Sequence, residues 1–222
     1  MGASQNGVRH VVWDWNGTLV DDSLVILECV NQVLDAFGIP HVTADFYRSH
    51  FSRPVTRFYE SLLGSRLSPS DWISIEEGFR TAYRERVNGV ALRPDAAGVL
   101  RQLRSNGTTQ SILSMWHEDD LLSRVWDLDI GQLFIEIDGS VGVGGGRKAA
   151  RLRRHLRQLR INHGIGTAGV VMVGDTLDDA DAAADSRVRC VLIDGGSHHR
   201  AALEQSGSPV VGSLSAAVEL WQ

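Results

Sequence analysis

The second half of the sequence alternates between short apolar runs and longer amphipathic segments. From Leu92 onward the spacing predicts helices over residues 95–105, 117–128 and 147–161, and strands over residues 109–115, 133–138, 169–173 and 189–193. Residues 9–13, rich in β-branched and aromatic side chains, predict one earlier strand. Such alternation is typical of parallel strands joined by right-handed helical crossovers. We therefore expect an α/β protein with a Rossmann-like parallel five-stranded sheet.

A helical insertion is expected to interrupt this sheet. Residues 22–88 show helical spacing only, and caps mark where the helices start. Asp22 or Ser23 can cap the first helix, and Thr43, Pro54 and the pair Ser68-Pro69 can begin three more. The predicted organisation is a core of residues 1–21 and 89–222 with an all-helical domain of residues 22–88 inserted into it.

The composition excludes several classes of protein. With 222 residues, 43% of them hydrophobic, and a net charge of −5, the chain offers no basic field for nucleic acid or an anionic membrane. No apolar run approaches the roughly 18–20 residues of a membrane span, and the polar first ten residues lack the apolar core of a signal peptide. Cys29 and Cys190 match no metal spacing and are expected to be buried free thiols. A cytoplasmic location is expected.

Two predicted strands end on carboxylates. Asp14 follows the first strand, and Asp175 follows the strand at residues 169–173, with Asp178 and Asp179 close behind. If these parallel strands are neighbours, the first two carboxylates meet at one sheet edge, where open α/β sheets bind ligands. Carboxylates this close repel unless a cation lies between them, and an open, oxygen-rich site suits Mg²⁺. The alternative for each acid is a turn or helix cap.

Lys148 is the only lysine in the sequence and precedes a predicted helix. A lysine is unfavourable at a helix N-terminus because of the helix dipole, which suggests that it serves another purpose. A compact ammonium also binds differently from the guanidinium found elsewhere in this chain. A hydroxyl, Ser114, lies near the end of the strand at residues 109–115. A solvated surface lysine is the alternative.

Taken in order, these segments resemble the haloacid dehalogenase superfamily of phosphotransferases. The first family motif, D-x-D-G-T-L, is similar to residues 14–19, and the strand-terminal hydroxyl of the second is similar to Ser114. The third motif, a lysine that opens a helix, fits Lys148, and the fourth, G-D-x-x-x-D, fits residues 174–179. The match covers essentially the whole chain. Residues 22–88 then correspond to a helical cap domain of the first class, as in phosphoglycolate phosphatase-like members.

The resemblance implies a role for each matched residue. Asp14 would be the nucleophile that forms an aspartyl-phosphate, which water then hydrolyses. Mg²⁺ would be held by Asp14, the backbone carbonyl of Asn16 and Asp175, with Asp179 at the same centre or positioning Lys148. Ser114 and Lys148 would bind the phosphoryl oxygens. The remaining residues expected to contact substrate are Gly17, Thr18 and Met115 of the core and His50 and Arg53 of the cap.

Asn16 departs from the family pattern. Hydrolases of the family carry a second Asp here, which protonates the leaving oxygen and later deprotonates the attacking water. An amide does neither, and such help is typically worth about 10²–10⁴ in rate. Three explanations compete. The first is a substrate with a good leaving group, such as an acyl phosphate, and the second is a cap residue, with His50 as candidate, that supplies the proton. The third is slow or absent turnover, with phosphate esters bound but not hydrolysed. Deamidation of the Asn16-Gly17 pair is a fourth alternative.

The expected substrate is a small phosphorylated metabolite, for which Arg53 and Arg57, four residues apart, could share a helix face. Phosphonate hydrolysis fits less well because the predicted cap has no lysine, and metal-free carbon–halogen cleavage leaves the acids near Asp175 unexplained. Two hypotheses remain: an Mg²⁺-dependent phosphatase, acting as a monomer or homodimer, and a weakened member that binds phosphorylated ligands as a regulatory module.

Overall fold

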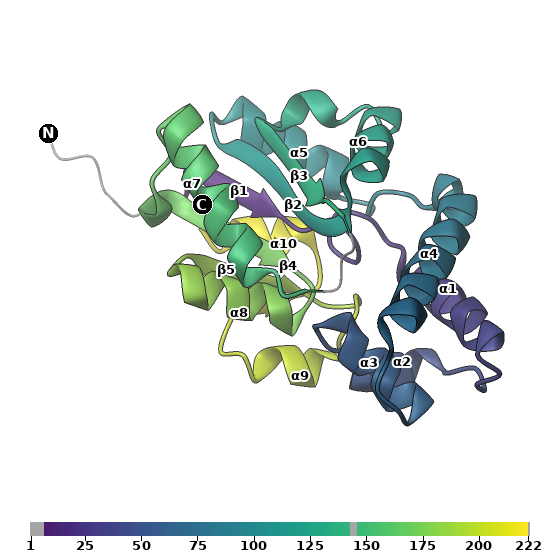
Figure 1. Cartoon of the computed structure of the whole chain (residues 1–222). Helices are drawn as coiled ribbons and strands as arrows, with labels where there is room; N and C mark the ends of the chain where they lie inside the picture. Colours follow the sequence, from purple (N-terminus) through teal and green to yellow (C-terminus); the bar gives the residue numbers. More distant parts are fainter. Residues whose placement is uncertain (1–6, 143–145, 222) are drawn as a thin grey trace, which may run out of the picture.

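The structure is a computed structural model that describes residues 7–142 and 146–221 (Figure 1). The polar N-terminal segment expected to carry no signal, residues 1–6, lies outside the described residues. No helix in the described part of the chain is long and apolar enough to cross a membrane.

In the described residues, six parallel strands form one sheet in the order β3-β2-β1-β4-β5-β6. They are β1 His10–Trp13, β2 Thr109–His117, β3 Glu136–Ser140, β4 Val170–Gly174, β5 Arg189–Ile193 and β6 Val210–Val211. The predicted α/β class and parallel sheet are confirmed, but the predicted count of five strands is wrong. β6 has only two residues, too few to produce a periodic pattern. The predicted strand 133–138 begins later than expected because a 3₁₀ turn, Gly131–Leu133, precedes β3.

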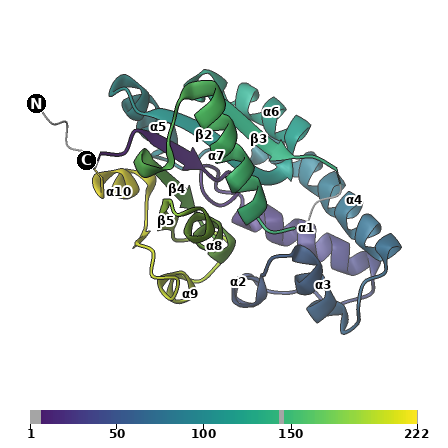
Figure 2. The same cartoon turned by 60° about the vertical axis from the view of Figure 1, so that its left-hand side comes forward.

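Helices cover both faces of this sheet (Figures 1 and 2). Successive side chains of β1 point to opposite faces, so Val11 and Trp13 belong to one cluster and Val12 to another. The first cluster packs against α5 Ala96–Ser105, α6 Glu118–Asp127 and α10 Leu214–Glu219. The second packs against α7 Ala149–His163 and α8 Leu177–Ser186, while α9 Arg200–Glu204 packs near β5 and β6. The result is three layers, with the carboxyl ends of the strands not covered by these helices.

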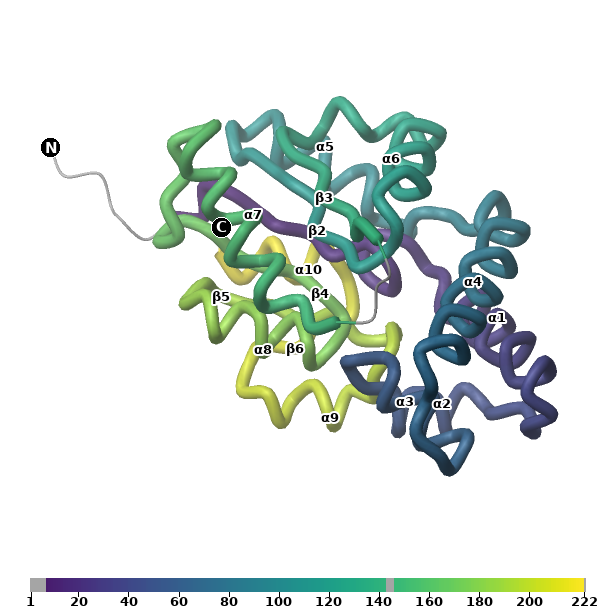
Figure 3. The backbone as a smooth tube through the Cα atoms, viewed as in Figure 1, coloured from purple at the N-terminus to yellow at the C-terminus, as the bar shows by residue number. Residues whose placement is uncertain are grey.

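The segment between β1 and α5 is helical and has an apolar core of its own. Its helices are α1 Ser23–Ala36, α2 Ala44–His50, α3 Val55–Leu63 and α4 Pro69–Arg86. Figure 3 follows the chain out of the sheet after β1 and back before α5. The two linkers run side by side, since the Asp21 amide donates to the Ala91 carbonyl at 3.1 Å and Val20 bridges Leu92.

All four predicted helix starts are confirmed. The Thr43 hydroxyl accepts a hydrogen bond from the Phe46 amide, Ser68 and Asp71 form a capping box, and α3 begins after Pro54. Asp22 precedes α1 as expected, but its side chain makes no capping hydrogen bond. That carboxylate is directed into the functional site instead. Of the two cysteines predicted to be buried, Cys29 is buried and Cys190 only partly so.

Candidate active site

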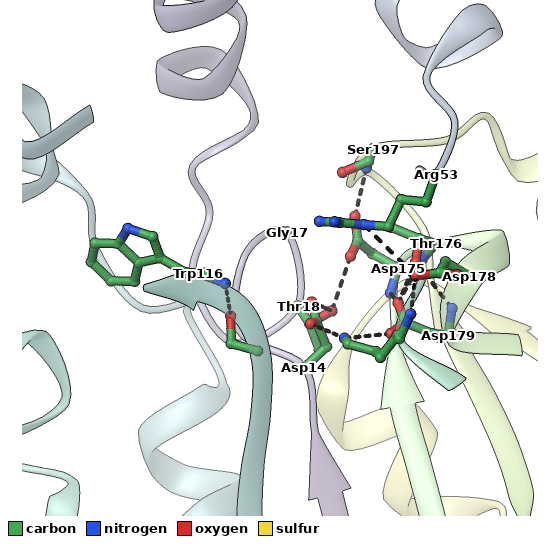
Figure 4. Close-up of polar contacts among 12 residues, drawn as sticks. Asp14, Gly17, Thr18, Arg53, Trp116, Asp175, Thr176, Asp178, Asp179 and Ser197 are labelled. Atoms are coloured by element: carbon green, nitrogen blue, oxygen red, sulfur yellow. Dashed lines mark hydrogen bonds and ion pairs between the residues drawn. The ribbon is translucent and has the colours of Figure 1, made fainter. Parts of the chain in front are cut away.

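Asp14 and Asp175 lie side by side at the carboxyl ends of neighbouring strands. Trp13 of β1 pairs with Val173 of β4, and the Asp14 amide donates to the Val173 carbonyl at 2.8 Å. The Thr18 hydroxyl lies 3.3 Å from a carboxylate oxygen of each Asp (Figure 4). Because a hydroxyl has one proton, it satisfies only one of the two carboxylates at a time. The neighbouring strands expected from the sequence are therefore present, with both acids buried.

Glycines let two loops close around the Asp175 carboxylate. Gly17 has a φ of +71°, and a Cβ there would overlap the Asp175 carboxylate, as would a Cβ on Gly196. The Ser197 amide donates to Asp175 Oδ2 at 2.6 Å, and Arg93 donates to the Gly17 carbonyl at 2.6 Å. A side chain at either glycine would therefore displace the acid, which explains why these positions need glycine.

Lys148 occupies the centre of the acidic cluster. Its ammonium donates to Asp14 Oδ1 and, at 2.6 Å, to Asp179 Oδ1, and only 3% of the residue is exposed. Its backbone amide donates to Asp178 Oδ2 at 2.9 Å. Burial alone would lower the pKa of Lys148, but the Asp14 and Asp179 carboxylates outweigh it and raise that pKa. The lysine is thus a buried cation held by Asp14 at the end of β1 and by Asp178 and Asp179 of α8, not a solvated one.

Asp179 is tied down through both of its oxygens. While Oδ1 accepts from Lys148, Oδ2 accepts from the Thr176 hydroxyl at 2.6 Å and from the amides of Thr176 and Asp175. Thr176 and Asp179 also form the capping box of α8. These contacts fit a residue that positions Lys148 better than one that is free to bind a ligand.

The donor set fits a hard divalent cation. One carboxylate oxygen from each of Asp14, Asp175 and Asp179 lies within 4.8 Å of the others, and all three residues are buried. Three carboxylates around one ammonium leave excess negative charge in a buried site. Burial raises the pKa of Asp14 to about 7 against the pull of Lys148, and burial together with Asp179 raises the pKa of Asp175 to about 6. A cation with oxygen ligands would relieve this charge.

The predicted phosphate-binding hydroxyl, Ser114, is buried near the end of β2, where its Oγ accepts from the Trp116 amide at 3.0 Å. Because Trp13 pairs with Ile112, Ser114 reaches the same sheet edge as Asp14. Met115 follows it and lines the cavity above the acids.

Asn16 belongs to a buried network that sequence reasoning missed. Its amide nitrogen donates to Asp22 Oδ2 at 2.6 Å and to the Tyr83 hydroxyl at 3.0 Å. Tyr83, from α4, itself donates to Asp22 Oδ2 at 2.6 Å, and the Gly17 amide donates to Asp22 Oδ1 at 2.8 Å. Burial raises the pKa of Asp22, although these hydrogen bonds oppose the shift. The only sequence signal was Asp22 itself, which reads as a helix cap.

A cavity of about 190 Å³ opens over Asp14 between the sheet edge and the helical segment. Arg53 lines it, with its Nε 3.8 Å from Asp178 Oδ2, and extends toward the acids in Figure 4. His50 is exposed, stacks on Phe46 and hydrogen-bonds to the Phe46 carbonyl, so it lies outside the cavity wall. Arg57 is exposed on α3, whereas Arg53 precedes that helix, so the two do not share a helix face.

The chain matches a family model. Residues 11–193 match the model of the haloacid dehalogenase-like hydrolases. The chain belongs to this family. A curated relative of this hydrolase, the phosphoglycolate phosphatase of Synechococcus elongatus, is 25% identical over 199 residues, 88% of each chain. The expectations of this family and of a phosphatase enzyme are thereby confirmed.

Solved structures share the whole fold of the hydrolase. A predicted phosphatase from Clostridium acetobutylicum superposes with a TM-score of 0.84 at 17% identity, covering 96% of this chain and 97% of that one. Protein tyrosine kinase A of Mycobacterium tuberculosis superposes with a TM-score of 0.78 at 23% identity, covering 97% and 98%. One fold thus carries the names of a phosphatase and of a kinase, so the reaction has to be argued from the site.

Proposed function

We propose that this hydrolase cleaves the phosphate monoester of a small metabolite through an aspartyl-phosphate on Asp14. The observation that carries the proposal is the buried group of Asp14, Lys148, Asp175 and Asp179 at one sheet edge. A nucleophilic carboxylate, a cation to receive phosphoryl oxygens and a further acid beside it are the parts that phosphoryl transfer requires. The relation to a curated phosphoglycolate phosphatase supports the same class of reaction.

The reaction divides into two displacements at phosphorus. A carboxylate oxygen of Asp14 attacks, the bond from phosphorus to the substrate oxygen breaks, and that oxygen leaves with the electron pair. Water then attacks phosphorus, and its P–O bond replaces the bond to Asp14, which returns as a carboxylate while inorganic phosphate is released. Lys148 and Ser114 would bind phosphoryl oxygens in both steps, and Asp179 would hold Lys148 in place.

The residues that would hold Mg²⁺ are Asp14, Asp175 and the backbone carbonyl of Asn16. When bound, the ion neutralises charge that otherwise repels a phosphate from the carboxylates. Asp179 is assigned here to Lys148 rather than to the ion, because both of its oxygens accept hydrogen bonds of 2.6 Å. Asp14 and Asp175 each have one oxygen that accepts only the shared, longer contact of 3.3 Å from the Thr18 hydroxyl among the described residues.

Residues 22–88 are proposed to act as a cap domain that closes over the phosphate site. The support is that α1 to α4 have their own apolar core and that residues from this segment line the cavity above Asp14. A cap of this kind excludes water from the reacting centre and contacts the part of the substrate that leaves.

Position 16 favours a second candidate function, a phosphate-ester binding module with little turnover. An amide cannot exchange the proton that the leaving oxygen needs, and here its NH₂ group is already donated to Asp22 and Tyr83. The phosphatase should hydrolyse a substrate whose leaving group needs no protonation, whereas the binding module should not.

Release of phosphate from acetyl phosphate, with Mg²⁺ present, separates them, since a carboxylate leaving group departs without protonation. We expect release by the wild type and none by Asp14→Asn, which keeps the shape but removes the nucleophile. Mass spectrometry of the quenched wild type should find phosphate on the peptide that contains Asp14. No release at high enzyme concentration, with phosphate analogues still bound, would favour the binding module.

A further inference from the structure

The cavity above the phosphate site is aromatic on the side where the leaving group of a substrate would lie. Trp116 of the core lines one part of it. The rest of this aromatic wall comes from seven residues of the helical segment: Tyr47, Phe51, Phe58, Tyr59, Trp72, Phe79 and Tyr83. Several are held in contact with one another, with Tyr83 edge-on to Trp116 at 5.0 Å and Phe79 stacked on Tyr83 at 6.0 Å. Such a wall favours a flat apolar group, because edge-on and offset-stacked ring pairs stabilise binding beyond the effect of buried area alone.

The charged residues of this wall do not favour an anionic leaving group. Arg53 lies against Asp178, and Arg80 lies against Asp120 with its Nε 3.1 Å from Oδ2. A substrate carboxylate would have to compete with these acids for either guanidinium. Both guanidiniums that line the cavity are thus paired with acids, which leaves the aromatic surface to contact an uncharged ring.

The volume of the cavity suits a single ring. The whole cavity, including the part above Asp14, measures about 190 Å³. An apolar cavity of roughly 150 Å³ is enough to take up benzene. One six-membered ring with its phosphoryl group is thus of a size that this cavity can hold.

The chemistry at position 16 selects the same kind of substrate. A phenol, with a pKa of about 10 as in tyrosine, leaves as phenolate far more readily than an alcohol, whose pKa is nearer the value of about 15.7 for water. A site with an amide in place of the acid therefore works best on a phenolic oxygen.

From these observations we propose that the substrate is a single-ring aryl phosphate monoester, with the ring held by the aromatic wall and the phosphate over Asp14. The proposal rests on the phosphatase function proposed above and narrows its substrate class. The bond that breaks joins phosphorus to the phenolic oxygen, which leaves with the electron pair and takes its proton from solvent.

The first test compares phenyl phosphate with cyclohexyl phosphate, which has a similar size but an alcohol as leaving group. We expect kcat/KM for phenyl phosphate to be at least about 100-fold higher, because about 10²–10⁴ in rate depends on the missing acid. Equal rates would overturn the proposal, since they would show that another group of the wall, such as His117 or Glu76, supplies the proton.

The second test isolates recognition of the ring from the leaving group. Phenylphosphonate, which cannot be hydrolysed, should inhibit acetyl phosphate hydrolysis with a Ki at least about tenfold lower than that of ethylphosphonate. Trp72→Ala should remove most of this difference, and Phe79→Leu, which keeps an apolar side chain, serves if the first variant does not fold. Phe46→Ala is the matched control, because this cap aromatic lies outside the cavity wall.

The outcomes separate the two proposals. Hydrolysis of acetyl phosphate without any preference for the phenyl compounds would overturn the aryl substrate and leave the phosphatase intact. No release from acetyl or phenyl phosphate would overturn the phosphatase itself. If Trp72→Ala and Phe46→Ala lose the preference for phenylphosphonate equally, the loss reflects a general disturbance of the helical segment. That result would overturn the proposed role of the aromatic wall.

Discussion

At the scale of single residues, the partners of Asn16 decide what a substitution there would do. Its side chain lies 2.6 Å from Asp22 Oδ2, so the amide is the donor that this buried carboxylate needs. An Asp at position 16 would instead set two acids against each other. The departure from the family motif is thus matched by its surroundings, which include Tyr83 of α4 as a second donor to Asp22.

Restoring the acid should therefore take two changes. We expect Asn16→Asp to raise turnover of cyclohexyl phosphate, but at a lower Tm than the wild type because of repulsion from Asp22. The pair Asn16→Asp/Asp22→Asn should recover the Tm and raise kcat at least about tenfold, toward the usual worth of an acid catalyst. Steady-state kinetics and thermal unfolding of the four proteins provide the check, with Asp22→Asn alone as control. Unchanged kcat in both variants would show that the missing acid is already replaced.

At the scale of elements, β1, β2 and α7 are joined by a buried polar chain. The His10 ring lies 2.8 Å from the hydroxyls of Thr109 and Ser111, and Ser111 Oγ lies 2.7 Å from His155 Nε2. His155 Nδ1 is 3.4 Å from Asp138 Oδ2, so serine, histidine and aspartate follow one another as in a hydrolase triad. Ser111 and His155 are fully buried, and neither lines the cavity over Asp14. This polar network therefore holds β1, β2 and α7 together rather than acting on a substrate.

The buried polar network around His10 predicts how the stability of the fold depends on pH. Burial, followed by the nearby His155 and His163, lowers the pKa of His10 to about 3 from an ordinary 6.5. Because the folded state binds the proton more weakly, the stabilisation is complete above pH 6.5 and is lost as the pH falls below it. We expect His10 to account for a loss of about 2 kcal/mol between pH 6.5 and 5. Urea unfolding at both values should give a smaller loss for His10→Asn, and an equal loss would contradict the prediction.

Helix α4 is tied to the β1 loop by one hydroxyl. Removing it in Tyr83→Phe leaves Asp22 with one donor fewer, and we expect a loss of about 1–3 kcal/mol in the free energy of unfolding. The matched control is Tyr59→Phe, whose buried hydroxyl has no hydrogen-bond partner among the described residues and should cost little. Similar losses in both variants would argue against the network.

At the scale of the whole molecule, a metal ion would couple stability to function, because it binds the folded arrangement of acids and not the unfolded chain. Mg²⁺ at 100 times its Kd should stabilise the fold by about 2.7 kcal/mol. We expect Mg²⁺ to raise the Tm of the wild type. Removing the Mg²⁺ with a chelator should reverse this rise and stop phosphate release. Asp175→Asn should abolish the Mg²⁺-dependent part of the Tm, whereas Asp181→Asn, on the exposed side of α8, should keep it. A rise of equal size in both variants would contradict the assigned site.

Much of this protein follows from local sequence. The strand and helix periods, the caps at Thr43 and Ser68 and the parallel class depend on side chains within a few residues of one another, and the structure agrees with them. Asp14 and Asp175 end their strands wherever the strands lie in the sheet. Their contact could be expected because parallel strands that are neighbours bring their carboxyl ends to one edge.

What only the tertiary structure decided depends on residues that are distant in sequence. Asp22 reads as a cap until Tyr83, 61 residues later, donates to it, and the aromatic stripe of α4 reads as core until it lines a cavity with Trp116. His50 and Arg57 have the right chemistry for a substrate site but lie outside the cavity wall. A side chain's role depends on which groups face it, and periodicity determines only the element on which it stands, whereas packing between elements determines its neighbours.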